Sequence, residues 1–174
     1  VSLRERQAVA RRENADLMVS IHADALRQNY VRGATIYTLA DKASDALAQE
    51  VADSENLADV VAGLAAPNET DIVTDILADL TLRETTHFSR AFSLMLVRKM
   101  RDRVNLINNP QRAASFAVLK NAEVPSVLLE LGYLSNNEDE HLMADPDWQS
   151  KVAGIVSEAV VEFFAGRQPR STGN

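Results

Sequence analysis

Short apolar runs along the chain alternate with longer segments in which apolar residues recur every three or four positions. The short runs predict buried strands, and the longer segments predict helices that turn one face to a core. The expected strands cover residues 16–22, 34–39, 116–120 and 125–131. The expected helices cover residues 2–14, 41–65, 71–84, a longer helix ending near 104, and 145–165. Ser2 is the expected cap of the first helix, residues 107–112 form an expected loop, and residues 167–174 an expected tail.

This alternation predicts one α/β domain over residues 1–166, with a mostly parallel sheet flanked by helices on both faces. The helical block from about 41 to 104 is long for a single crossover, so we interpret it as an insertion beside the sheet. The insertion is either a regulatory element or lid, or additional cover for the core. The pattern alone leaves both interpretations open.

Composition narrows the class of protein. The chain has 174 residues, which fits one domain, and its net charge of -7 argues against a nucleic-acid partner. It has no cysteine, which excludes a disulfide scaffold and thiolate metal sites. No apolar run approaches the roughly 20 residues that a membrane helix needs, so we expect no membrane insertion. The opening "VSLRERQAVARREN" begins without Met and within a charged helix, which predicts an N-terminally incomplete domain.

Two expected strands end on residues that can carry chemistry. "LMVSIH" ends at His22, and "VPSVLLE" ends at Glu130. Because ligands sit beyond the carboxyl ends of strands in open α/β sheets, parallel neighbouring strands would present both side chains to one crevice. A buried carboxylate also needs a metal, a cation or hydrogen bonds. The alternatives are a core histidine bonded to a backbone carbonyl and a glutamate paired with an arginine. We interpret His87 and His141 as surface residues.

Two segments together resemble the zinc-dependent N-acetylmuramoyl-L-alanine amidases of bacterial cell division. They are "SIHADA", residues 20–25, and "FAVLKNAEVPSVLLELGYLSNNEDEHLM", residues 116–143, and the resemblance extends over nearly the whole chain. It implies cleavage of the amide between N-acetylmuramic acid and the L-alanine of the peptidoglycan stem peptide. It also implies a zinc ion with His22 as one ligand and Glu130 as the catalytic residue that takes a proton from water. The family's other histidine and glutamate ligands normally lie upstream, and their motif does not occur in this sequence.

The resemblance also assigns a role to the helical block. In the division-type branch, a helical insert, here about residues 45–85, places a glutamate in the open position of the zinc until an activator withdraws it. The candidate is Glu55, with Glu69 and Glu84 as alternatives. The resemblance implies an activator of the degenerate metalloprotease (LytM-like) type, a location in the periplasm or cell envelope, and a monomer active in daughter-cell separation. The alternatives are a non-catalytic cell-wall binding or regulatory module of the same fold and a zinc carboxypeptidase.

Overall fold

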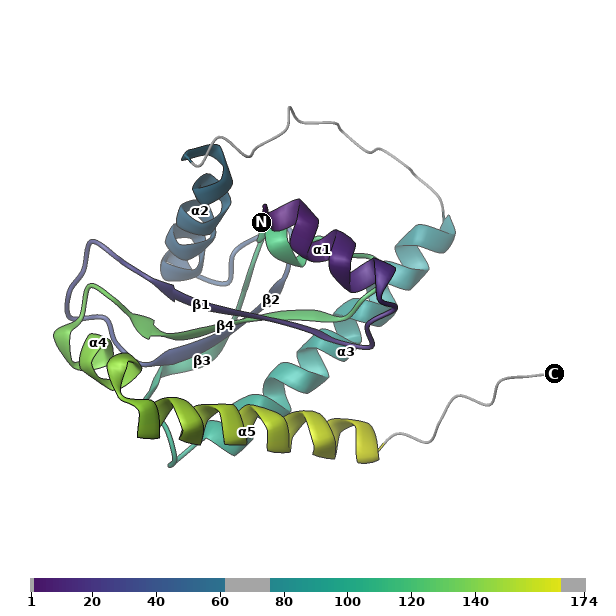
Figure 1. The fold of residues 1–174 in the computed structure, drawn as a ribbon. Helices are drawn as coiled ribbons and strands as arrows, with labels where there is room; N and C mark the ends of the chain where they lie inside the picture. Colours follow the sequence, from purple (N-terminus) through teal and green to yellow (C-terminus); the bar gives the residue numbers. More distant parts are fainter. Residues whose placement is uncertain (1, 62–75, 167–174) are drawn as a thin grey trace.

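A four-stranded mixed sheet forms the centre of the molecule (Figure 1). The computed structural model describes residues 2–61 and 76–166. The strands are β1 (Met18–Asp24), β2 (Ala34–Leu39), β3 (Leu106–Ala114) and β4 (Ser126–Tyr133), in the spatial order β1-β4-β2-β3. The pairs β1–β4 and β2–β3 are parallel, whereas β2 and β4 are antiparallel. The α/β class is therefore confirmed, with one antiparallel pairing within the sheet.

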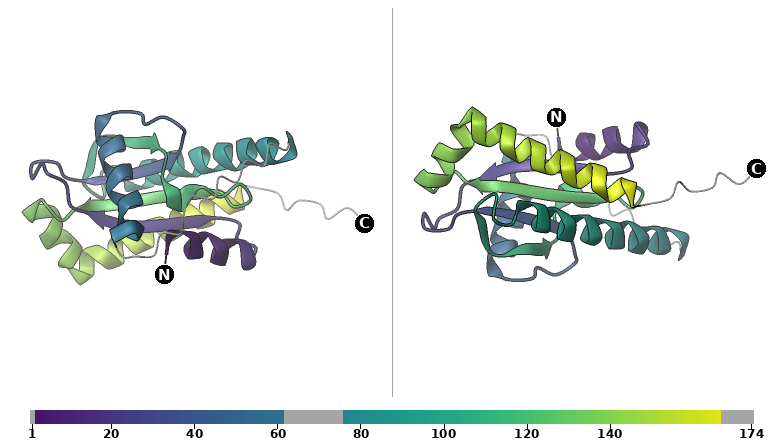
Figure 2. Two further views of the ribbon diagram at one scale, coloured as in Figure 1. Left: turned by 90° about the horizontal axis from the view of Figure 1, so that it is seen from above. Right: turned by 90° about the horizontal axis from the view of Figure 1, so that it is seen from below.

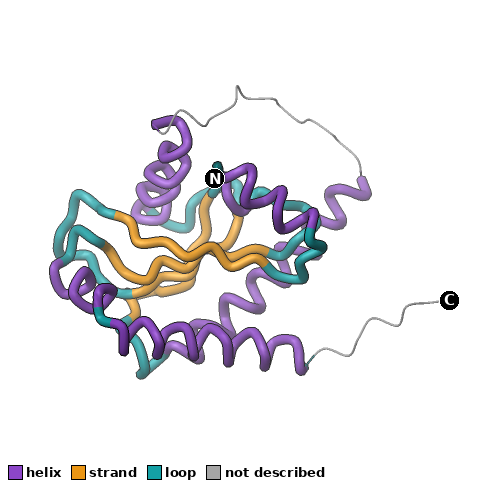
Figure 3. Tube along the Cα trace, in the orientation of Figure 1, coloured by secondary structure: helices purple, strands orange, loops and turns teal. Residues whose placement is uncertain are grey.

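The antiparallel pairing follows from the short connection between β1 and β2. Residues 25–33 join the two strands, and parallel strands need a crossover of about a dozen residues or more. The chain therefore turns back at the end of β1 and runs in the opposite direction. Because β1 and β4 are parallel neighbours, the loops that follow these two strands lie at the same end of the sheet (Figure 3).

Helices cover both faces of the sheet, as expected (Figure 2). One face carries α1 (Leu3–Arg12), α2 (Ala46–Val61) and the short 3₁₀ helix η1 (Ala117–Leu119), and the opposite face carries α3 (Ile76–Met100) and α5 (Pro146–Ala165). The helix α4 (Asn137–Ala144) follows β4 directly. Side chains alternate between the faces: Tyr37 and Leu128 join the core under α1 and α2, and Ile36 and Leu129 join the core above α3 and α5.

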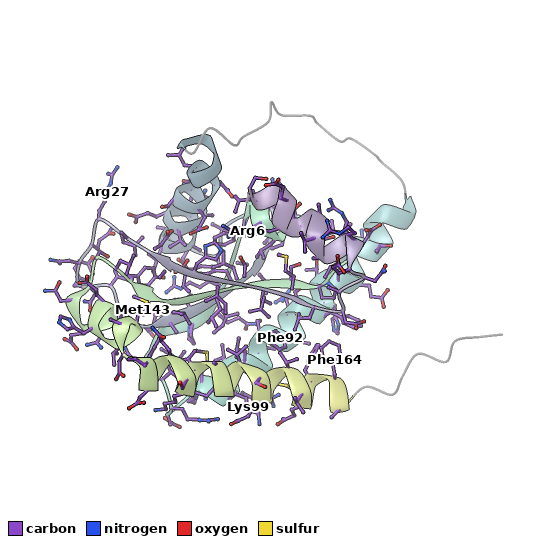
Figure 4. The ribbon with its side chains drawn as sticks, in the orientation of Figure 1. Arg6, Arg27, Phe92, Lys99, Met143 and Phe164 are labelled. Carbon is purple, nitrogen blue, oxygen red and sulfur yellow. The ribbon has the colours of Figure 1, made fainter. Side chains whose placement is uncertain are left out.

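Several local predictions are confirmed by specific contacts. Ser2 caps α1: its side-chain oxygen accepts the backbone N–H of Glu5 at 3.2 Å, and its backbone N–H donates to the Glu5 carboxylate. The four-residue spacing from Phe88 to Met100 falls within α3. Phe92, labelled in Figure 4, is fully buried there. Its ring packs against that of Phe163 of α5, with the ring centroids 5.3 Å apart.

Two local predictions are wrong. Residues 116–120 do not form a strand, because Ala117–Leu119 wind into η1, whose Val118 and Leu119 are buried beside α1. A short apolar run is compatible with either structure, so its pattern could not decide between them. The expected loop 107–112 lies instead within β3, an edge strand whose register with β2 is interrupted between Leu106 and Gln111, and Pro110 falls in that interruption.

The helical block is also arranged differently from the prediction. The segments expected at 71–84 and beyond belong, from Ile76 onward, to one continuous helix, α3. Residues 62–75, which include Glu69, and the expected tail at 167–174 lie outside the described residues. None of the described helices combines the length and apolar character needed to cross a membrane.

Candidate metal and catalytic site

The sheet register brings the two predicted site residues together. In the parallel β1–β4 pair, His22 lies directly opposite Glu130. Period-two alternation directs Ser20 and His22 to the α2 side, while Ile21 between them faces the other side and is 58% exposed. The imidazole and the carboxyl group thus share one face of adjacent strands, as the sequence predicted.

Helix α2 adds a second carboxylate to this pair. Glu55 Oε2 lies 2.6 Å from His22 Nδ1, and both side chains are less than one-tenth exposed. On the other side of the ring, His22 Nε2 lies 2.7 Å from Ser20 Oγ. His22, Glu55 and Glu130 each offer a potential ligand atom, and these three atoms lie within 4.8 Å of one another. Among the described residues, this is the group assembled with the spacing of a metal site.

One of the two carboxylate oxygens of Glu130 has a hydrogen-bond partner among the described residues, and the other has none. Its side chain is fully buried, and its Oε2 accepts the backbone N–H of Asp24 at 3.1 Å. Its Oε1 has no hydrogen-bond partner among the described residues. A buried carboxylate oxygen without a donor is costly, so the site is chemically incomplete without a proton or a cation near Oε1.

The electrostatics of the site point the same way. Burial, followed by the nearby Asp24 and Glu55 carboxylates, raises the pKa of Glu130 well above its usual range. Burial and the adjacent Glu55 raise the pKa of Asp24 to about 7. Burial alone would raise the pKa of Glu55, but the hydrogen bond and charge of His22 outweigh it and lower that pKa. Three carboxyl groups therefore lie close to one imidazole, and the raised pKa values mean that Glu130 and Asp24 favour the protonated form unless a cation is bound nearby.

These donors suit zinc. An imidazole nitrogen and carboxylate oxygens are the ligand types that zinc takes in catalytic sites, and the unpartnered Glu130 oxygen marks where positive charge is missing. His22, Glu55 and Glu130 each present one donor atom of a type that such an ion accepts.

Two sets of contacts fasten α2 over the site. The Asn56 side chain, next to Glu55, donates to Ser115 O at 2.9 Å and accepts from the N–H of Ala117 at 2.6 Å. At the start of α2, the Asp45 carboxylate accepts the N–H of Ala48 at 2.9 Å and pairs with Arg112 of β3. Sequence reasoning missed Asn56, since an asparagine inside a helix carries no signal of the loop it will contact.

The other candidate residues do not join the cluster. Glu84 is exposed on α3, and Glu69 lies outside the described residues. His87 on α3 and His141 on α4 are exposed, as predicted. Sequence reasoning assigned no role to Ser20 or to the Asp24 side chain. For Ser20 a signal existed, because a Ser-x-His spacing on a strand places both side chains on one face.

Comparison with known proteins identifies what this arrangement resembles. The family model described as N-acetylmuramoyl-L-alanine amidase matches residues 1–162. N-acetylmuramoyl-L-alanine amidase AmiA of Escherichia coli K12 is 32% identical over 165 residues, covering 94% of this chain and 57% of AmiA. AmiC from another Escherichia coli strain is 30% identical, but only 40% of it is covered. The chain thus spans about half the length of these relatives.

A solved structure shares the fold. Amidase AmiC2 of Nostoc punctiforme matches with a TM-score of 0.58 and 21% identity, covering 95% of this chain and 67% of AmiC2. The CwlD amidase of Clostridioides difficile, solved in complex with the GerS lipoprotein, matches with a TM-score of 0.54 and 20% identity, covering 95% of this chain and 62% of CwlD. At these identities the likeness establishes a common fold.

Proposed function

This chain belongs to the N-acetylmuramoyl-L-alanine amidase family, and we propose that it forms the part of a zinc-dependent peptidoglycan hydrolase that carries the catalytic carboxylate and one metal ligand. The substrate bond is the amide between N-acetylmuramic acid and the L-alanine of the stem peptide. The observation that carries the proposal is the buried Glu130, which lies opposite His22 on the adjacent strand and whose Oε1 has no hydrogen-bond partner among the described residues.

Glu130 moves the proton in this reaction. Its carboxylate accepts a proton from the attacking water as the water oxygen bonds to the scissile carbonyl carbon. The same carboxyl group then donates that proton to the alanine nitrogen as the carbon–nitrogen bond breaks. The Asp24 N–H on Oε2 leaves Oε1 to carry the proton and keeps the carboxyl group oriented on its strand.

His22 supplies one ligand to the zinc. Zinc held there would polarise the scissile carbonyl and lower the pKa of a water bound to it to about 7. One imidazole does not make a tight site, so we propose that the remaining protein ligands come from a segment outside this sequence. Support comes from β1, which occupies one end of the described strand order and pairs only with β4 within it.

Glu55 keeps the site closed in the proposed resting state. Its carboxylate lies 2.6 Å from His22 Nδ1, so it would take up a coordination position that water and substrate need on a metal held by His22. Arg6 of α1, on the same side of the sheet as α2 (Figure 4), adds a favourable charge that further lowers the pKa of Glu55. Opening requires α2 to move, and a partner must bind the open state more tightly to shift this balance.

The biological setting follows from the family proposal. We place the protein in the periplasm or cell envelope, where peptidoglycan lies, and assign it to daughter-cell separation as a monomer. The partner that withdraws α2 is a septal activator of the degenerate metalloprotease (LytM-like) type. The CwlD complex supports the general idea that an amidase of this fold works with a protein partner.

The test of the activity uses the full-length protein and purified peptidoglycan. We expect Glu130→Gln to abolish release of stem peptides while thermal unfolding and zinc content remain those of the wild type. The matched control is Glu123→Gln, a glutamate in the loop before β4 that lies outside the cluster. Wild-type hydrolysis by Glu130→Gln would remove this residue from the mechanism. A wild-type protein that binds the wall without cleaving it would favour the non-catalytic module, and release of free amino acids would favour a carboxypeptidase.

The test of the closed state uses the insertion glutamates. We expect Glu55→Ala to raise basal hydrolysis in the absence of any activator, whereas Glu84→Ala, on the exposed surface of α3, leaves it unchanged. Glu69→Ala completes the set, because Glu69 was an alternative candidate. Equal basal activity in all three variants and the wild type would refute occlusion by the insertion.

A further inference from the structure

We propose that Asp139 is a positioning residue for Glu130, because its buried carboxylate holds the irregular end of β4 across which the Asp24 N–H reaches the Glu130 carboxylate. The inference rests on the proposed function, since it takes Glu130 as the group that moves the proton. Asp139 lies in the first turn of α4, the helix that follows β4 (Figure 1), and only 3% of it is exposed.

The pairing of β1 with β4 is irregular immediately after Glu130. His22 pairs with Glu130, but the next paired residues are Asp24 and Tyr133, so β4 has one residue more than β1 in this interval. In a regular strand, residues 130 and 133 would face opposite sides of the sheet. Because the extra residue forms a bulge, Tyr133 instead joins the core under α1 and α2, on the face of Glu130. Its hydroxyl lies there 3.3 Å from Thr35 Oγ1, and Thr35 is the residue that pairs with Glu130 on β2.

The hydrogen bond that orients Glu130 spans this bulge. Asp24 is tied to the part of β4 beyond the bulge, because its carbonyl accepts the N–H of Leu134 at 2.7 Å. Its own N–H donates at 3.1 Å to Oε2 of Glu130, which precedes the bulge. The distance between this donor and the Glu130 carboxylate therefore depends on the path of residues 131–133.

Asp139 fixes that path from outside the strand. Its Oδ2 accepts the N–H of Tyr133 at 3.1 Å and the N–H of Gly33, just before β2, at 2.7 Å. The carboxylate also lies directly against the bulge, since a Cβ added at Gly132 would be 2.7 Å from Oδ2. One buried oxygen thus ties the residues after Glu130 to the start of the antiparallel neighbour β2.

The burial of Asp139 is not explained by its place in α4 alone. Three acidic residues occupy the first turn of this helix, and Glu138 and Glu140 are exposed. A carboxylate can stabilise a helix start from the surface, so that role needs no buried side chain. The remaining oxygen of Asp139, Oδ1, lies 3.6 Å from Arg32 Nε, and this cation offsets the cost of burying the charge.

The experiment measures the Glu130 contact and the reaction separately in the full-length protein. Hydrogen exchange at the Asp24 amide, followed by NMR, reports the contact, and kcat and KM for a soluble N-acetylmuramoyl peptide report the reaction. We expect Asp139→Ala to accelerate exchange at Asp24 roughly 10-fold or more. It should lower kcat roughly 10- to 100-fold with little change in KM, because the proton-transfer group is misplaced. Asp139→Asn keeps an acceptor oxygen for the two N–H groups, so both values should lie nearer to those of the wild type.

Asn121→Ala is the matched control. Asn121 is also 3% exposed, and its Oδ1 accepts the N–H groups of Glu123 and Val124 in the loop before β4. Its loss should lower stability and leave both Asp24 exchange and kcat unchanged.

The inference would be overturned if Asp139→Ala matched Asn121→Ala in Asp24 exchange and kcat, or if its exchange rose while kcat stayed at the wild-type value. If the wild type cleaves nothing, the proposed function fails. Wild-type exchange at Asp24 in Asp139→Ala would then show independently that Asp139 does not place Glu130.

Discussion

The amide of Asn56 offers a sharp test of how α2 is held over the site. Truncation to Ala removes the donor to Ser115 O and the acceptor of the Ala117 N–H. Both backbone groups flank Phe116, which is fully buried, so they cannot readily turn toward water. The variant therefore leaves two partly buried backbone groups without partners in the closed state.

The size of the effect follows from those two groups. Leaving a buried donor or acceptor unpaired costs about 1–3 kcal/mol, and partial burial places Asn56→Ala within that range. The cost applies only while α2 is docked, so the open state gains population by about 5- to 150-fold. The docked state should keep its packing, because Ala48, Val51 and Ala52 of α2 remain buried in the core.

Two measurements check this prediction. Basal hydrolysis of peptidoglycan by the full-length protein should rise by the same factor, limited by the activity of Glu55→Ala. Hydrogen exchange should accelerate in α2 and not in α5. Gln49→Ala is the control, because the Gln49 amide bonds only to Asp53 of the same helix among the described residues. Unchanged exchange in α2 together with unchanged basal hydrolysis would refute the idea that Asn56 fastens this helix.

Three further predictions concern the scaffold. Phe92→Ala should lower the free energy of unfolding by about 3–5 kcal/mol in a denaturant titration, because the ring is fully buried against Phe163; a loss below about 1 kcal/mol would contradict this packing. Gly33→Ala should also destabilise the fold, because Gly33 has φ +97° and an added Cβ would lie 2.8 Å from Ile107 N; a wild-type melting temperature would contradict that. Burial raises the pKa of Asp45, but the Ala48 N–H and Arg112 outweigh it and lower the pKa. The stabilisation by Asp45 is therefore fully present above its unfolded pKa of about 4, and it is lost as the pH falls through the lower folded pKa. We expect Asp45→Asn to be less stable than the wild type at pH 7 and equally stable near pH 2. The same difference in stability at both pH values would exclude an ionised Asp45 as the cause.

Periodicity in the sequence predicted the elements whose pattern is long or unambiguous. The strands at 16–22, 34–39 and 125–131, the first and last helices and the four-residue stripe of α3 all correspond to elements of the structure. The prediction from periodicity failed at residues 107–112 and 116–120, because short mixed or apolar runs fit more than one structure. Only pairing with β2 and burial beside α1 decide those segments.

The sequence by itself also predicted which side chains meet at the strand ends, because His22 and Glu130 each end an apolar run that leads to the crevice of an α/β sheet. Only the tertiary structure shows which glutamate of the insertion contacts His22. Glu55 and Glu84 lie in expected helices and Glu69 lies between them, and nothing in the pattern itself shows which of the three reaches His22. The contact between Glu55 and His22 depends on the docking of α2. Asn56 and Asp45 hold α2 in place through bonds to residues that are distant in sequence, and no local pattern indicates such partners.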